Sequence, residues 1–218
     1  SIDQPGPAYT DQGGWYGQAM WIDDQRIVVA GPSGRLIVWA PDAGKIIRRI
    51  NDPPATGTGS PSAVLVTQDG ADVVAAGSTM MAYDLQTGAR RWPRPRPVGP
   101  AVALDPRSRL VWAQEAGFGS SRLFAYDLAT GERSQAELDG QHGTVCSVHV
   151  APDARTIAVS SCNEGNVALW ALDGATATGG AVESAGWASS EDLWSPDGIH
   201  VAAFRVDTLD AVEVINTR

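Results

Sequence analysis

The sequence predicts an all-β protein, a β-propeller of about five four-stranded blades, and three observations lead there. An aromatic residue before a turn recurs at Trp39, Tyr83, Tyr126 and Trp170, in steps of 44, 43 and 44 residues, and one further step of 44 reaches Val214. Short alternating apolar runs separated by Gly, Asp, Asn and Pro indicate strands and hairpins, and no segment keeps a helical period. A four-stranded unit repeated at about 40 to 45 residues is the signature of a propeller blade.

Each unit is predicted to follow the same strand order, which residues 144–183 show most clearly. There the inner strand TVCSVHV is followed by the turn APDAR and the return strand TIAVSS. A third strand, VALWAL, comes next, and DGATATGG leads to an outer strand. The Asp-Leu-x-Thr-Gly turns at 84–88 and 127–131 have a mechanical role, because Asp and Thr bond the local backbone and Gly takes a positive φ.

These units predict a single propeller domain over residues 1–218, and the two ends suggest how it closes. Residues 8–22 align without gaps on 136–150, so the N-terminal segment 1–12 is expected to supply a closing outer strand. The fifth unit ends after its third strand, which favours a closed ring of five blades. The alternative is a part of a larger ring of about six to eight blades. The expected blades are 16–52, 61–95, 100–139, 144–183 and 187–218.

Composition and charge narrow the classes of function. The net charge of −9 disfavours binding to nucleic acid or to anionic membranes, which needs the opposite sign. No run approaches the roughly 18 apolar residues of a membrane helix, so no membrane insertion is expected. One lysine against fifteen arginines, with abundant Ala, Gly and Pro, suggests a bacterial gene of high G+C content. Residue 1 is Ser rather than Met, which suggests a mature form or an excised domain of a longer chain.

The units resemble bacterial propellers of the WD-repeat type. TIAVSSCNEGNVALWAL follows the WD-repeat rhythm, with Trp170 in the third strand and His142 of GQHG at the family's Gly-His position. The resemblance implies a buried hydrogen-bonded set of His142, Trp170, a turn Asp and either Ser160 or Ser161. Cys162 or Asn163 stands where that Asp is expected. LWSPDGIHVAAFRVD instead resembles repeats of Tol-system periplasmic propellers, and FAYDLATGE resembles pyrroloquinoline-quinone-type repeats.

Aromatic residues in glycine-rich loops are the main candidates for a binding surface. Trp15, Tyr16 and Trp187 precede inner strands, and Phe118 lies in AGFGSS. By blade geometry these loops open on one face of the ring, and such aromatic residues commonly anchor a protein or a sugar. The alternative is that each tryptophan packs between neighbouring blades. Further candidates for this loop face are His142, Glu191 and Asp192.

Glu191 and Asp192 also raise a hydrolase alternative, because they fall on the fifth inner strand, which lines the propeller axis. Glycoside hydrolysis needs at least two carboxylates about 5 to 9.5 Å apart on opposing sides of a sugar. The other inner strands offer acids only at their far ends, Asp23 and Asp105. The favoured interpretation is therefore an acidic pair on a solvated loop or channel wall.

The two cysteines, Cys146 and Cys162, fall on neighbouring strands of the fourth unit. A hairpin that turns at residues 152–155 places them nearly opposite each other, which suits a disulfide, and the alternative is two buried thiols. A bridge favours an exported domain over a cytoplasmic one. The spacing of His and Cys matches no zinc site, so we expect no metal and no cofactor.

Four arginines, Arg90, Arg91, Arg94 and Arg96, alternate with prolines in ARRWPRPRP, the one basic cluster of an acidic chain. This cluster suits docking to an acidic partner, or use as a proline-rich ligand for a recognition domain. The alternative is protection of an exposed outer strand, since charge and proline prevent edge pairing. Arg48 and Arg49 occupy the matching stretch of the first unit, in favour of that alternative.

The sequence therefore predicts a non-enzymatic protein-interaction or sensory propeller. Its partner would be another protein or another domain of the same longer chain, recognised through the loop face bearing Trp15, Tyr16 and Trp187. A small-ligand or carbohydrate-binding propeller is the first alternative, and a glycoside-hydrolase-type propeller ranks last. In every case the strands form a rigid frame and the loops carry the function.

Overall fold

The computed structural model describes most of the chain as antiparallel strands. The described residues are 18–31, 35–50, 63–105, 107, 109–117, 120–138, 144–161, 167–173, 176–184, 186–187, 194–195, 197–205 and 212–216. They contain no helix, and hence none that is long and apolar enough to cross a membrane. The chain divides into two compact units, Ser1–Pro97 and Val98–Arg218.

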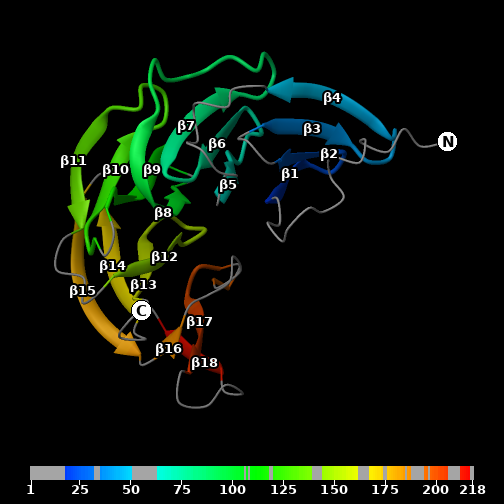
Figure 1. The fold of residues 1–218 in the computed structure, drawn as a ribbon. Coiled ribbons are helices and arrows are strands. Elements are labelled where there is room, and N and C mark those ends of the chain that lie inside the picture. The colour runs from blue at the N-terminus through cyan, green and yellow to red at the C-terminus, as the bar shows by residue number, and fades with distance from the viewer. Residues whose placement is uncertain are drawn as a thin grey trace. The chain divides into compact units, whose positions relative to one another are not determined.

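The first unit holds two sheets whose strands lie side by side in chain order (Figure 1). The strands of the first sheet are β1 (Ala19–Asp23), β2 (Arg26–Ala30), β3 (Leu36–Ala40) and β4 (Lys45–Ile50). Those of the second are β5 (Ala63–Val66), β6 (Asp72–Ala76) and β7 (Thr79–Asp84), followed by the start of β8 (Arg96–Leu104). Only Arg96 and Pro97 of β8 pair with β7, because proline cannot donate to a strand ladder and this segment is proline-rich.

The second unit repeats the same arrangement. The rest of β8 pairs with β9 (Leu110–Glu115), which is followed by β10 (Leu123–Asp127) and β11 (Arg133–Leu138). The next sheet contains β12 (Val145–Val150), β13 (Thr156–Ser161), β14 (Val167–Asp173) and β15 (Thr176–Ser184). The last contains β16 (Gly186–Trp187), β17 (His200–Arg205) and β18 (Val212–Asn216).

The predicted period is present in the strand register, with one slip. Trp39, Tyr83, Tyr126 and Trp170 all lie on the third strand of a sheet, each opposite the second residue of the strand before it. In the last sheet that place belongs to Ile215, which pairs with Val201, so the fourth step is one residue longer than predicted. A slip of one residue turns a side chain to the other face of its strand, and Val214 is accordingly 62% exposed.

The core of each unit consists of side chains between sheets. In the first unit every residue of β6 is buried, and Met80, Met81 and Tyr83 of β7 are almost fully buried. In the second unit Trp112, Leu123 and Ile157 belong to one apolar cluster. The first sheet is two-faced: Val28 and Val38 are buried on one side, whereas Trp21 on the other is 61% exposed.

Candidate functional site

Most of the residues predicted to form the loop face lie outside the described residues, namely Trp15, Tyr16, Phe118, His142, Glu191 and Asp192. Trp187 was predicted to lie in a loop before the inner strand, but the structure places it in β16, where its backbone pairs with Phe204. The loop face therefore stays a prediction. The described part of the site is the frame of turns, ion pairs and strand edges that carries the loops.

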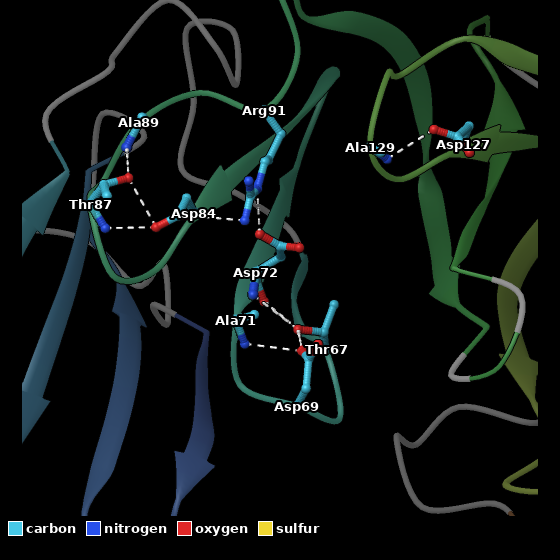
Figure 2. Close-up of polar contacts among 10 residues, drawn as sticks. All are labelled: Thr67, Asp69, Ala71, Asp72, Asp84, Thr87, Ala89, Arg91, Asp127 and Ala129. Atoms are coloured by element: carbon cyan, nitrogen blue, oxygen red, sulfur yellow. Dashed lines mark hydrogen bonds and ion pairs between the residues drawn. The ribbon is translucent and has the colours of Figure 1, made fainter.

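The Asp-Leu-x-Thr-Gly turns form as predicted and are scaffold. Asp84 Oδ1 accepts hydrogen bonds from the Thr87 backbone N–H at 2.6 Å and from its hydroxyl at 2.9 Å (Figure 2). Asp127 does the same with Thr130 at 2.8 and 3.0 Å. The glycines Gly88 and Gly131 have φ values of 76° and 69°. Bonding to the Thr87 backbone is the main reason that the pKa of Asp84 is lowered.

A second repeated turn joins the inner strand to the second strand. Thr67 Oγ1 donates to Asp69 Oδ1 at 2.6 Å and accepts from the Asp72 backbone N–H at 2.9 Å (Figure 2). Ser195 makes the same two bonds, to Asp197 at 2.5 Å and from the His200 N–H at 2.9 Å. The sequence signal is Thr/Ser-x-Asp-Gly, so these aspartates stabilise turns.

Two carboxylates face each other across β6 and β7, and one arginine bridges them. Asp72 pairs with Asp84 in the strand register, which brings two like charges together. Arg91 Nε lies 2.6 Å from Asp72 Oδ1, and Arg91 Nη2 lies 2.8 Å from Asp84 Oδ2 (Figure 2). The bond to Asp72 is the main cause that raises the pKa of Arg91. Sequence reasoning placed Arg91 in a basic cluster and missed both partners, because they are distant in the chain.

The other members of the predicted basic cluster differ in their surroundings. Arg90 is exposed and forms an isolated bridge with Tyr83 through its backbone. Trp92 is buried, and Arg94 is exposed. Arg96 is half-buried, and its Nε has no acceptor among the described residues. Residues 91–94 form a bend, so the predicted continuous outer strand is interrupted here.

Cys146 is disulfide-bonded and lies on β12 at a bulge, between the pairs Val145–Ser161 and Ser147–Ser160. The remaining pairs of β12 and β13 have the register that the hairpin predicted. The only other cysteine of the chain, Cys162, is outside the described residues, so the pairing of the two stays a prediction.

The WD-repeat set implied by resemblance is only partly described, because His142 and residues 162–163 are not. Ser160 Oγ lies 2.6 Å from Ser147 Oγ. The Trp170 Nε1 is buried and has no acceptor within the described part of the chain. His149, also on β12, is mostly buried, and desolvation lowers its pKa to about 4. Its carbonyl accepts a hydrogen bond from the Trp194 indole at 3.3 Å.

The third sheet carries a charged group on its outer strand that sequence reasoning missed. Arg122 pairs with Glu137 of β11, and Arg133 pairs with the same carboxylate at 3.1 Å. Arg133 Cζ lies 3.2 Å from the ring centroid of Phe124, and Arg122 Cζ lies 5.0 Å from it. Phe124 lies opposite Glu137 in the register, which brings these side chains together. Among the described residues, no group of three His, Cys, Asp or Glu could hold a metal ion.

Comparison with solved structures identifies the fold. Matches extend to 1196 chains, so the fold is widespread and does not by itself select a function. One, a WD-repeat propeller in the crystal structure of the mitotic checkpoint complex, is 16% identical with a TM-score of 0.71. The alignment covers 94% of this chain and 64% of that one, so this chain spans less than two thirds of that relative's length. The predicted β-propeller is confirmed.

Comparison with known sequences identifies the family. No curated protein matches the chain. The profile of the family described as outer membrane protein assembly factor BamB matches residues 11–206, in line with the pyrroloquinoline-quinone-type character of FAYDLATGE. The resemblance to Tol-system repeats and the bacterial origin stay predictions. Since that profile spans far more than half of its residues, this β-propeller chain belongs to the BamB family of outer membrane protein assembly factors.

Proposed function

We propose that this chain is a non-enzymatic protein-interaction module that recognises a protein partner through the loop face bearing Trp15, Tyr16 and Trp187. The observation that carries the proposal is the family match, because an assembly factor for outer membrane proteins works on other proteins. The chain of the mitotic checkpoint complex is likewise a propeller within an assembly.

The described strands, turns and ion pairs support a role in presenting the loops to a partner. The described aspartates at the ends of strands hold turns, as Asp84 and Asp127 do, or share an arginine, as Asp72 does. Turns fixed in this way keep the strands in register and hold the loops between them in place. Tryptophan and tyrosine on such loops bring large contact area at low cost in side-chain entropy.

The test is affinity capture from a lysate of the source cells. The Trp15→Ala/Trp187→Ala variant is expected to lose the specific partner that the wild-type chain retains, with an unchanged far-UV circular dichroism spectrum and melting temperature. Trp21→Ala is the matched control, since Trp21 is an exposed tryptophan on a strand and is expected to keep the partner. A partner retained by the double variant would show that recognition lies elsewhere.

A thermal-shift screen against sugars, nucleotides, divalent metals and quinone cofactors separates the alternatives. A specific ligand at about 100 times its Kd adds about 2.7 kcal/mol of stability, which is readily measured. A clear shift with a sugar would favour the carbohydrate-binding alternative. Hydrolysis of that sugar would favour the glycoside-hydrolase alternative.

A further inference from the structure

An apolar row crosses every described sheet at the second residue of its second strand, which has a paired residue on each side. In the first sheet this row is Trp21, Ile27 and Trp39, and we call it the leading face. The central residues of the rows in the later sheets are Val73, Val111, Ile157 and Val201. Each of those four is 0% exposed, whereas Ile27 is half-buried and Trp21 is 61% exposed. The leading face of the first sheet is therefore left uncovered.

The second unit shows what covers such a row. In the last sheet Val201 packs in one cluster with Ala158 and Leu169, which lie opposite each other in the fourth sheet. In the fourth sheet Ile157 belongs to one cluster with Trp112 of the third sheet. Each row is thus covered by the other face of the sheet that precedes it in the chain.

The last sheet presents an uncovered surface of the covering kind. Ala202 pairs with Val214 at the register position of the covering pair one sheet earlier, and we call these two residues the trailing face. Ala202 is half-buried and Val214 is 62% exposed. In the described part of the chain, the other large apolar side chains that are exposed are Trp21 and Ile47 of the first sheet. Exposed apolar side chains on one surface favour association with another surface.

The distribution of charge favours contact between unlike units of two copies. Residues 1–97 contain nine Lys and Arg and nine Asp and Glu, whereas residues 98–218 contain seven and sixteen. The leading face belongs to the neutral unit and the trailing face to the acidic unit. A contact between these two faces avoids the repulsion that would arise if two acidic units met.

We propose that copies of this chain associate head to tail, with the leading face of one copy packed on the trailing face of another. The contact repeats the one that the second unit already makes between consecutive sheets. Because it joins two different surfaces, it leaves one leading and one trailing face free, so association continues beyond the dimer as the concentration rises. The inference goes beyond the proposed function, since it concerns another surface and a second copy of the same chain.

The test is the molar mass of the purified chain, measured by size-exclusion chromatography with light scattering from about 1 to 200 μM, because association follows mass action. The wild-type mass is expected to rise from 22.9 kDa to at least twice that value. Trp21→Glu and Val214→Glu are each expected to raise the Kd of association by about tenfold or more, because each places an unpaired carboxylate in an apolar contact. Gln86→Glu makes the same change in charge at an exposed turn of the second sheet, and is expected to associate like wild type.

Mixing the two variants tests whether the contact is head to tail. A Trp21→Glu copy keeps its trailing face and a Val214→Glu copy keeps its leading face, so an equimolar mixture is expected to form a dimer and no larger species. A wild-type chain that stays monomeric over the whole range, or a mixture without dimer, would overturn the proposal. Association of Val214→Glu alone at the wild-type level would also overturn it, because the leading face would then pair with itself.

If the glutamate variants do not fold, as judged by far-UV circular dichroism, Trp21→Ala and Val214→Thr replace them. Both positions are exposed, and each change is expected to raise the Kd of association by about threefold or more. Trp21→Ala is also expected to keep the partner of the loop face, so failure of the loop-face proposal and failure of head-to-tail association give different results.

Discussion

Arg91 holds two carboxylates that would otherwise repel each other, so Arg91→Leu removes both ion pairs at once. Asp72 is 1% exposed and lies directly opposite Asp84 in the strand register. Removing one partner of a fully buried ion pair costs about 3–5 kcal/mol, because the other charge is left buried without compensation. The Arg91 side chain is 39% exposed, and solvent screening lowers the expected loss to about 2–3 kcal/mol. For a chain of this length that loss corresponds to a fall in melting temperature of about 4–12 °C.

The repeat itself supplies the compensating variant. In the next sheet Leu110 takes the place of Asp72 and pairs with Asp127, with no second carboxylate. The Asp72→Leu/Arg91→Leu variant therefore places a leucine opposite a single aspartate, as the next sheet already does. Replacement of a buried ion pair by apolar groups is often close to neutral, so the double variant is expected to lie within about 1 kcal/mol of wild type.

The measurement is equilibrium urea unfolding followed by circular dichroism, with Arg91→Lys as the conservative control. Lysine keeps the charge but cannot donate two directed bonds from a planar group, so it is expected to recover only part of the loss. The reasoning is refuted if Arg91→Leu costs less than about 0.5 kcal/mol, the usual range of an exposed pair. It is also refuted if the double variant is as unstable as Arg91→Leu alone.

Four further outcomes are expected. Gly99→Ala lowers stability by about 1–3 kcal/mol, because the new Cβ would lie 2.4 Å from the buried Gln114 Oε1, and Gln114→Ala in the same chain restores the melting temperature. His149 is neutral in the folded protein, because its pKa is about 4 against an ordinary 6.5. Its contribution to folding stability is therefore fully present above pH 6.5 and is lost as the pH falls toward 4. A flat urea-unfolding profile over that range, or the same slope in His149→Gln, contradicts this. Asp127→Ala removes three turn hydrogen bonds and is expected to lower the free energy of unfolding by about 1 kcal/mol. Asp127→Asn, compared with it in thermal melts, is expected to keep most of that stability. Reduction of the Cys146 disulfide is expected to cost about 2–4 kcal/mol, and a thiol assay that titrates two thiols in unreduced, denatured protein would contradict the bridge.

The parts of the fold that sequence reasoning predicted well are those encoded within a few residues. The turn at 84–88 needs only Asp, Thr and Gly at fixed spacing, and these residues bond one another. The hairpin register of β12 and β13 follows from the position of its turn, so the strand pairs came out as predicted. The step to Val214 was wrong by one residue, because the length of a loop cannot be read from a period.

The candidate site could be predicted from the sequence only in part. Composition and repeats determined the propeller, its four-stranded units and the existence of a basic segment in an acidic chain. Only the tertiary structure decided that Arg91 is engaged by Asp72 and Asp84, that Arg48 lies against the turn at Thr87, and that Trp92 anchors the segment. Local hydrogen bonds depend on neighbours in the chain, whereas these contacts join a strand, a turn and a bend that lie in different parts of the chain. Such contacts exist only once the strand register and the packing between sheets bring the side chains together.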